Sequence, residues 1–245
     1  MIRNLKVLIA AAMALAAFGA LSATAHAAEE KFHCSVEPCR ATMVPDEVAG
    51  TTTAHHVWMV KGKTASGGES TLGLTCDQLV GEATSPLKTS TELTFTNLKY
   101  ENAKGEQKCR LAGVEAFTVD FTSCDFNFKS AGGSKSAAQL HVLCTTAGDG
   151  IDINFSGTTC LQVTPFTTTG LGFHDSELGG KKKTVTASMS NVAIPAAALD
   201  LKNIGNSNCS LFGLTSIISA TYTTGNTLIK TETDPAGVPA EAWFE

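Results

Sequence analysis

The sequence is poor in charged and aromatic residues and lacks a basic stripe. Asp, Glu, Lys and Arg make up only 17% of its 245 residues, against roughly 25% in a typical globular domain, so Thr, Ser and Asn supply most of the polarity. The formal net charge is −5, and no basic stripe is present to neutralise phosphates, which argues against a nucleic-acid partner. The hydrophobic share of 43% is too high for a disordered acidic chain.

Long apolar runs are also absent, except for one near the N-terminus. A basic start precedes the Ala-rich apolar stretch 7–21, and Ala25-His26-Ala27 fits the small-x-small rule for signal cleavage. The stretch has about 15 residues, whereas a membrane-spanning helix needs about 20. We therefore expect a signal peptide over 1–27, of bacterial type, cleaved after Ala27. Residues 28–245 are then secreted or extracytoplasmic and do not span the membrane after cleavage.

The cysteines lack the spacings that are typical of zinc or redox sites, which are paired close knuckles or a C-x-x-C. An even number of cysteines in an exported protein indicates disulfides instead. The eight cysteines are Cys34, Cys39, Cys76, Cys109, Cys124, Cys144, Cys160 and Cys209.

Sequence alone leaves the connectivity of these cysteines open. Two pairs flank stretches that resemble hairpins, one pair closes a short loop around Pro38, and the remaining two cysteines then form a long-range pair. The pairs favoured on these grounds are Cys109–Cys124, Cys144–Cys160, Cys34–Cys39 and Cys76–Cys209.

Helical patterns are nearly absent after residue 27, and strand patterns dominate. Apolar residues occupy the odd positions of 117–121 and 151–155, while polar residues such as Asp120 and Asn154 occupy the even ones. This alternation predicts strands with one buried and one exposed face. Turns rich in Gly, Ser, Asn and Lys separate the strands. The sequence therefore predicts an all-β fold, an antiparallel β-sandwich or jelly-roll-like arrangement stabilised by disulfides.

The length of 28–245 suits either one large β unit or two tandem units. A weak internal similarity links the segment around His55-His56 to the one around Phe173-His174. If it reflects duplication, the division lies near 147–150. Similarity of this kind also arises by chance between Thr-rich strands, so both arrangements stay open.

Signatures of catalysis are sparse. Ser85-Pro-Leu-Lys88 matches the S-x-x-K motif of penicillin-recognising enzymes, but their partner motifs are missing, so a polar turn is the simpler interpretation. Glycoside hydrolysis needs two carboxylates in one cleft. The acidic residues weighed for that role are Glu115, Asp120, Asp125 and Asp152. No catalytic residue is assigned.

No metal or cofactor is expected. His55 and His56 are consecutive in a strand, so their side chains point to opposite faces and suit one metal poorly. The stretch 149–154 has oxygen ligands at alternating positions, but Cys160 stands where a calcium loop needs its Glu.

Several segments together carry a resemblance that spans nearly the whole of residues 28–245. They are FHCSVEPCR at 32–40, TAHHVWMV at 53–60, LTCDQLVGEAT at 74–84, TYTTGNTLIKTETD at 221–234 and AEAWFE at 240–245. With these segments the chain resembles uncharacterised exported bacterial β-proteins that contain cysteines. The resemblance implies export and a structural role for the cysteines. It implies no activity, cofactor or site.

Two functional hypotheses follow. The first is a non-enzymatic secreted or cell-surface β-protein with a structural or ligand-binding role towards an unidentified ligand or cell-surface component. The alternative is a secreted hydrolase or carbohydrate-active enzyme on the same scaffold. A concave pocket with convergent acids favours the enzyme, and isolated titratable groups on a flat surface favour the module. The only residues expected to form broad platforms for sugars are Trp58, Tyr100, Tyr222 and Trp243.

Overall fold

A computed structural model describes residues 31–45, 56–85, 87–101, 109–111, 114–130, 138–178, 182–231 and 240–244. The signal peptide predicted at 1–27 and His55 lie outside these residues. In the described part of the chain, no helix has the length and apolar character needed to cross a membrane.

The structure confirms the all-β prediction, because strands make up 72% of it. The strands of the first half are β1 (Phe32–Cys34), β2 (Cys39–Pro45), β3 (His56–Thr64), β4 (Glu69–Cys76), β5 (Gln78–Ser85), β6 (Thr89–Ser90), β7 (Glu92–Glu101), β8 (Cys109–Leu111) and β9 (Val114–Asp120). Those of the second half are β10 (Cys124–Lys129), β11 (Ala138–Cys144), β12 (Ile151–Phe155), β13 (Thr158–Val163), β14 (Phe166–Leu178), β15 (Lys182–Ile194), β16 (Leu199–Leu201), β17 (Leu214–Thr231) and β18 (Ala242–Phe244). Two 3-10 turns, η1 (Ala196–Ala198) and η2 (Ser207–Phe212), flank β16.

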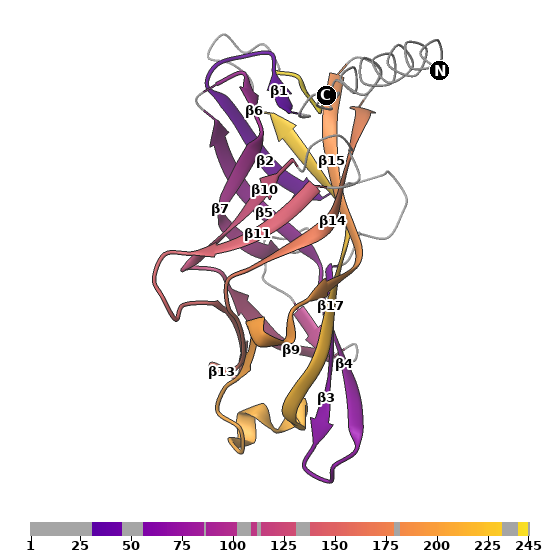
Figure 1. Cartoon of the computed structure of the whole chain (residues 1–245). Coiled ribbons are helices and arrows are strands. Elements are labelled where there is room, and N and C mark those ends of the chain that lie inside the picture. Colours follow the sequence, from indigo (N-terminus) through magenta and orange to yellow (C-terminus); the bar gives the residue numbers. More distant parts are fainter. Residues whose placement is uncertain are drawn as a thin grey trace, which may run out of the picture.

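Most strands belong to one large, curled antiparallel sheet (Figure 1). The long strand β17 lies in the middle of the strand order, and an arm of further strands extends from each of its two sides. One arm runs from β17 through β2, β5, β7, β10, β11, β14 and β15, and β15 pairs with β17 again, so this arm is a closed ring. The second arm runs from β17 through β3, β4, β8, β9, β12, β13 and β16, and β16 comes back to lie near β17. The sandwich or jelly-roll detail of the prediction is not confirmed, and the division near 147–150 stays a prediction.

The first and last described strands meet in a separate sheet of three strands. β1 lies between β18 and β6, with Phe32 opposite Phe244 and Ser90. Phe32 also packs edge-on against Phe173 of β14, with 4.8 Å between ring centroids. The small sheet therefore covers one end of the ring.

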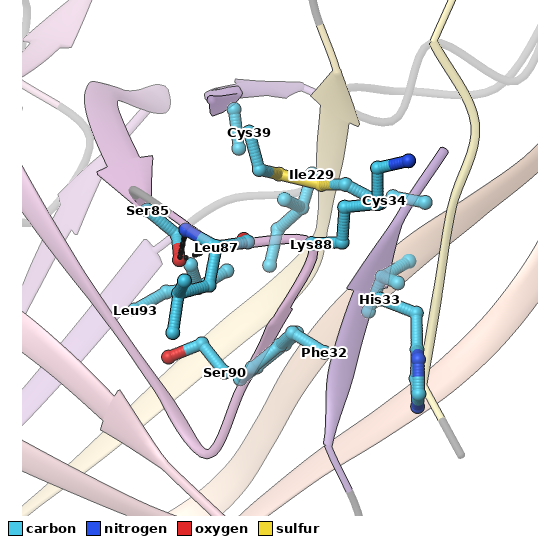
Figure 2. A pocket seen from close by; sticks show the side chains of 13 residues that line it. Phe32, His33, Cys34, Cys39, Ser85, Leu87, Lys88, Ser90, Leu93 and Ile229 are labelled. Atoms are coloured by element: carbon cyan, nitrogen blue, oxygen red, sulfur yellow. Dashed lines mark hydrogen bonds between the residues drawn. A yellow bond between two sulfur atoms is a disulfide. The ribbon is translucent and has the colours of Figure 1, made fainter. Parts of the chain in front are cut away.

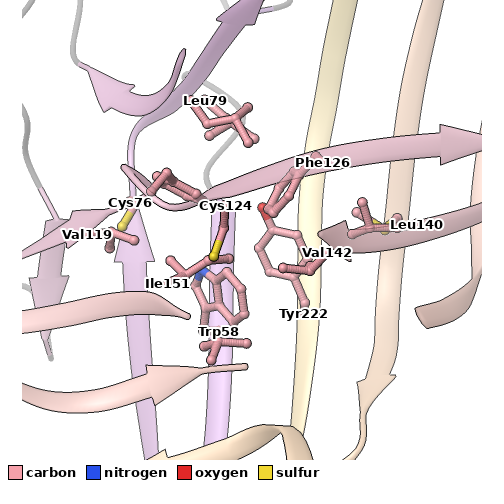
Figure 3. Packing of buried hydrophobic residues seen from close by; sticks show 14 of the residues in the cluster. Trp58, Cys76, Leu79, Val119, Cys124, Phe126, Leu140, Val142, Ile151 and Tyr222 are labelled. Carbon is pink, nitrogen blue, oxygen red and sulfur yellow. The ribbon is translucent and has the colours of Figure 1, made fainter. Parts of the chain in front are cut away.

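The core follows the alternation read from the sequence. Val119 on β9 and Ile153 on β12 are buried, whereas Asp120 is exposed and Asn154 is half-buried. The buried face carries most of the large side chains, and Figure 3 shows Trp58, Phe126 and Tyr222 projecting into the core from three different strands. Each fully buried aromatic or aliphatic side chain stabilises the fold by about 1.5–3 kcal/mol.

All eight cysteines form disulfides, which confirms the expected chemistry. Cys76–Cys109 joins β4 to β8, and Cys124–Cys144 joins β10 to β11; in both pairs the cysteines are directly opposite in register, with Cα atoms 4.1 Å apart. This short separation resembles the roughly 4.5 Å of non-hydrogen-bonded pairs in antiparallel sheets. These two disulfides therefore reinforce the sheet at points where strands already pair.

Of the four predicted pairs, Cys34–Cys39 is correct and the other three are wrong. The observed partners are Cys76–Cys109, Cys124–Cys144 and Cys160–Cys209. The error has one cause. The prediction assumed that consecutive strands pair as hairpins, but the chain passes from the second arm into the ring between β9 and β10, and back between β11 and β12. Cysteines on either side of such a crossing are not sheet neighbours.

Candidate functional site

A polar groove of about 590 Å³ opens where β7 of the ring approaches the end of β9 in the second arm. This volume lies within the roughly 300–1,000 Å³ of small-molecule sites. Most of the lining is polar: Thr96, Asn97, Lys99, Thr118, Asp120, Thr122, Asp125 and Asn154, with Leu98, Val119 and Phe121 as apolar neighbours. The groove thus lies where the chain crosses from the second arm into the ring, between β9 and β10.

The first wall comes from β9 and β12, and strand alternation explains it. Thr118 and Asp120 are exposed because Phe117 and Val119 between and beside them fill the core. In the register of β9 and β12, Asn154 lies opposite Thr118. Directly opposite residues of paired strands present their side chains on the same face, so the two polar side chains line the same wall.

The second wall comes from β7, where the strand carries an irregularity. The pairing of β5 with β7 shifts between Val80 and Glu82, and Asn97 has a φ of 53°. A bulge of this kind changes the direction of a strand and re-aims its side chains. Gly81 on β5 allows the close approach, because a Cβ there would lie 2.7 Å from Cδ2 of Leu98. The bulge brings Thr96, Asn97 and Lys99 to the groove.

The turn between β9 and β10 closes the groove at one end. The backbone N–H of Cys124 donates to the carbonyl of Phe121 at 2.7 Å. Oδ1 of Asp120 accepts from the backbone N–H of Thr122 at 2.8 Å and also from the Thr122 hydroxyl. Because Cys124 is also bonded to Cys144, the turn is fixed by backbone, side-chain and covalent links.

The three charged side chains of the groove, Asp125, Lys99 and Asp120, differ in burial and in their partners. Burial raises the pKa of the Asp125 carboxyl above its ordinary value, although this residue is still half-exposed. Lys99 forms an ion pair with Glu101, so its charge is already offset. The Asp120 carboxylate, in contrast, accepts the two bonds from Thr122.

Two rows of polar residues continue from the groove across β12 and β13. In one row, Gln162 Nε2 donates to Oδ1 of Asp152 at 2.9 Å, and Asp152 lies opposite Asp120. In the other row, the Thr159 hydroxyl donates to Oδ1 of Asn154 at 2.8 Å. The polar face is therefore longer than the groove itself.

A second polar cluster is fully buried in the core of the sheet. His56 Nδ1 lies 2.7 Å from the Tyr222 hydroxyl, which lies 3.0 Å from the Tyr100 hydroxyl. Trp58 Nε1 donates to Tyr100 at 3.2 Å. Burial raises the pKa of both tyrosines well above the ordinary value. Sequence reasoning missed this cluster, because only the fold brings β3, β7 and β17 together around it.

The S-x-x-K segment lies in the turn between β5 and β6, as the simpler interpretation predicts. The Ser85 hydroxyl donates to the carbonyl of Leu87 at 3.1 Å. Beside it is an enclosed space of only about 10 Å³, close to the Cys34–Cys39 disulfide (Figure 2). A space of that size holds about one water molecule, so it does not accept a ligand.

The acidic residues weighed for catalysis are divided among different places. Asp120 and Asp125 line the groove, and Asp152 lies next to it on β12. Glu115 lies on β9 opposite Arg110, and the structure describes only its backbone. In the described part of the chain, no group of three or more His, Cys, Asp and Glu side chains is placed to hold a metal ion.

The remaining histidines with described side chains have local partners. The His33 ring stacks on Trp243 at 5.1 Å between centroids. His141 Nε2 lies 3.1 Å from Oε1 of Gln139, and its Nδ1 lies 3.1 Å from the Thr167 hydroxyl. Neither histidine lines the groove, although His141 lies on β11, which pairs with β10, the strand of Asp125. No family model, curated protein or solved structure matches the chain, so the chemistry of the groove has to be argued from its own residues.

Proposed function

We propose that the chain is a non-enzymatic bacterial β-protein that binds a ligand outside the cytoplasm, secreted or at the cell surface, through the groove between β7 and β9. Four disulfides support the compartment, because disulfides persist in oxidising environments. The proposal includes the signal peptide over 1–27 and its cleavage after Ala27.

The observation that carries the binding role is the rigidity of the groove. Its walls are two paired strands, a bulged strand and a turn that the Cys124–Cys144 disulfide holds. A site on rigid elements loses little conformational entropy when a ligand binds, so more of the contact energy appears as affinity.

One observation favours the alternative, a secreted hydrolase. Asp120 and Asp125 share the groove in different surroundings, since one accepts two hydrogen bonds and burial raises the pKa of the other. Enzymes that cleave glycosides use such an unlike pair, in which a protonated carboxyl donates a proton to the leaving oxygen and a carboxylate attacks the sugar or activates water.

Backbone amide chemical shifts of the exported protein test the binding role. We would add neutral tetrasaccharides, an oligogalacturonide, spermine and a tetrapeptide, each in turn. The expected result is that at least one of these probes shifts the amides of 118–125 and leaves those of 64–69, at the far end of β3 and β4, unchanged. If all of them leave the groove amides unchanged, the binding proposal is wrong.

Chromogenic glycosides and esters test the alternative. We expect no release of the chromophore above the buffer rate. Release that Asp125→Asn abolishes and Glu69→Gln preserves would instead establish the hydrolase, because Glu69 lies on β4, outside the groove, in an exposed ion pair with Lys61.

A further inference from the structure

We infer that the groove binds a neutral carbohydrate chain, which extends from β7 across β9 and β12 onto β13. The inference rests on the proposed binding role of the groove and adds the class of its ligand. Hydrogen-bond chemistry, charge, the length of the polar face and the apolar residues beneath it support it.

The groove offers donors and acceptors at high density. Hydroxyls come from Thr96, Thr118 and Thr122, and amide groups come from Asn97 and Asn154. The Thr96 and Thr122 hydroxyls already donate, to the Glu82 carbonyl and to Asp120, so they offer acceptors to a ligand. Hydroxyls and amides both donate and accept. Sugar hydroxyls have the same dual character, so a carbohydrate satisfies this mixture without leaving buried polar groups unpaired, whereas a purely donating or accepting ligand does not.

Internal bonds decide which atoms remain for a ligand. Thr122 occupies Oδ1 of Asp120, which leaves Oδ2 as an acceptor. Thr159 occupies Oδ1 of Asn154, which leaves the amide nitrogen as a donor. Asp120 of β9 and Asn154 of β12 are diagonal neighbours on adjacent strands, because Asp120 lies opposite Asp152 and Asn154 lies opposite Thr118. A carboxylate oxygen beside an amide donor suits a pair of neighbouring sugar hydroxyls.

The charge of the groove disfavours an anionic ligand. Asp120 and Asp125 are its acidic residues, and its Lys99 is paired with Glu101. Among the described residues that line the groove, no other cation is available, so a phosphate or a uronic acid would be repelled by these carboxylates. A neutral ligand avoids this repulsion, and the carboxylates still accept its hydroxyl protons.

The extended polar face indicates a chain rather than a single sugar. The row from Asp120 through Asp152 reaches Gln162 on β13 and continues with the exposed Asp200, which lies opposite Gln162 on β16. Adjacent strands lie about 4.8 Å apart, so this row reaches about 10 Å beyond β9 at Gln162 and about 14 Å at Asp200. A linear oligosaccharide with its first unit in the groove would contact the row with its following units.

Apolar residues beneath the polar walls suit the C–H faces of a sugar. Leu98, Val119 and Phe121 line the groove and belong to the core. Only 3–6% of each is exposed, so they offer small apolar contacts rather than a platform. The aromatic candidates do not supply one in the groove, because Trp58, Tyr100 and Tyr222 are buried and Trp243 stacks on His33 outside it. Binding without such platforms relies mainly on hydrogen bonds, so changes to single polar groups should have measurable effects.

The experiment compares binding of neutral tetrasaccharides (gluco-, manno- and chito-configured) to the disulfide-bonded exported protein with binding to Asn154→Ala and Asp125→Asn. The control is Glu69→Gln, because Glu69 lies on β4 in an exposed ion pair with Lys61, outside the groove and the polar row. Amide shifts in a titration give both the dissociation constant and the location of binding. We expect one neutral series to shift amides in 118–125 and 152–162. Asn154→Ala and Asp125→Asn should weaken binding about fivefold to tenfold, and Glu69→Gln should not change it.

The outcomes separate the two proposals. If the oligogalacturonide, spermine or the tetrapeptide shifts the groove amides and no neutral sugar does, the carbohydrate inference is wrong and the binding role stands. If no probe shifts them, both are wrong. Equal affinity of Asn154→Ala and wild type, with both proteins folded by circular dichroism, also overturns the inference.

Discussion

The hydroxyls of Tyr100 and Tyr222 lie 3.0 Å apart in the core, although the two residues are separated by 122 positions in the chain. Trp58 donates to Tyr100, and His56 lies within hydrogen-bond distance of Tyr222. The contact links β7 of the ring to β17, the strand that both arms share. Satisfied polar groups at such a position fix one arrangement of the strands, because any shift in register leaves them unpaired.

Removing one hydroxyl from this cluster should destabilise the protein. Tyr222→Phe leaves both His56 and Tyr100 without a bond that they make in the native protein, and a buried polar group without its partner costs about 1–3 kcal/mol. Urea unfolding measures the change in free energy. Thr71→Val, which removes an exposed hydroxyl on β4, is the control and should change it by less than about 0.5 kcal/mol. Equal stability of Tyr222→Phe and wild type would contradict the role given to the cluster.

Alkaline pH should weaken the fold through the same two tyrosines. Burial raises the pKa of Tyr100 and Tyr222 above the ordinary value. Unfolded tyrosines lose their protons near pH 10, so above that pH the folded chain keeps protons that the unfolded chain has lost. Their stabilisation is complete below about pH 10 and declines as pH rises, by up to about 1.4 kcal/mol per pH unit for each tyrosine.

Urea unfolding from pH 8 upwards, with tyrosinate absorbance recorded in parallel, measures this decline. Tyr222→Phe should show a shallower dependence above pH 10, because one of the two buried hydroxyls is gone. Tyrosinate absorbance that appears near pH 10 while the native fold persists would show that the hydroxyls are accessible, contrary to the structure.

The sequence predicts the β class and one wall of the groove, and it fails where the answer depends on distant strands. The alternation of apolar and polar residues at 117–121 and 151–155 identifies Asp120 and Asn154 as outward-facing. It can be read from the sequence because successive side chains of a strand point to opposite faces. The wall from β7 depends on a bulge at Asn97, which the pairing with β5 imposes. The partners of Cys109 and Cys124 depend on the chain's crossing between the arms. No local pattern encodes that crossing.

Gly81 should be intolerant of a side chain. In Gly81→Ala, the new Cβ would lie 2.7 Å from Cδ2 of Leu98 and 3.3 Å from the carbonyl oxygen of Thr96. Overpacking of this kind costs about 1–3 kcal/mol and should displace the β7 wall. Thermal unfolding and the amide shifts of 96–99 measure both effects. Gly73→Ala is the matched control, because its nearest neighbour is the flexible Met59 at 3.4 Å; equal losses in the two variants would refute the explanation.

The Cys124–Cys144 disulfide should stabilise both the fold and the groove. It closes a segment with a sequence separation of 20, and loops near this length gain about 3 kcal/mol from cross-linking. We expect Cys124→Ser with Cys144→Ser to lower stability by about that amount and to broaden the amide signals of 118–125. Cys34→Ser with Cys39→Ser, whose separation is only 5, should cost less and leave the groove signals sharp. The opposite order of stability would disprove this assignment.

Export should yield a shortened, fully oxidised protein. Expressed with its own leader in a bacterial host, the chain should be recovered outside the cytoplasm with Ala28 as its first residue. Intact mass and non-reducing peptide mapping measure both features, and the mapping should return the pairs 34–39, 76–109, 124–144 and 160–209. Cytoplasmic protein that retains residues 1–27 would contradict the proposed location, and alkylated thiols in unreduced samples would contradict the pairing.

The position of β17 near the end of the chain determines the order in which the molecule is able to assemble. Strands β2 and β3 both pair with it, so in the proposed export of the chain about 150 residues or more separate them from a neighbour that arrives late during translocation. Pairings of such long range form slowly, and until then the early strands have open edges that invite aggregation. We expect this polypeptide to need protection by a chaperone between its emergence from the translocation channel and the arrival of residues 214–231.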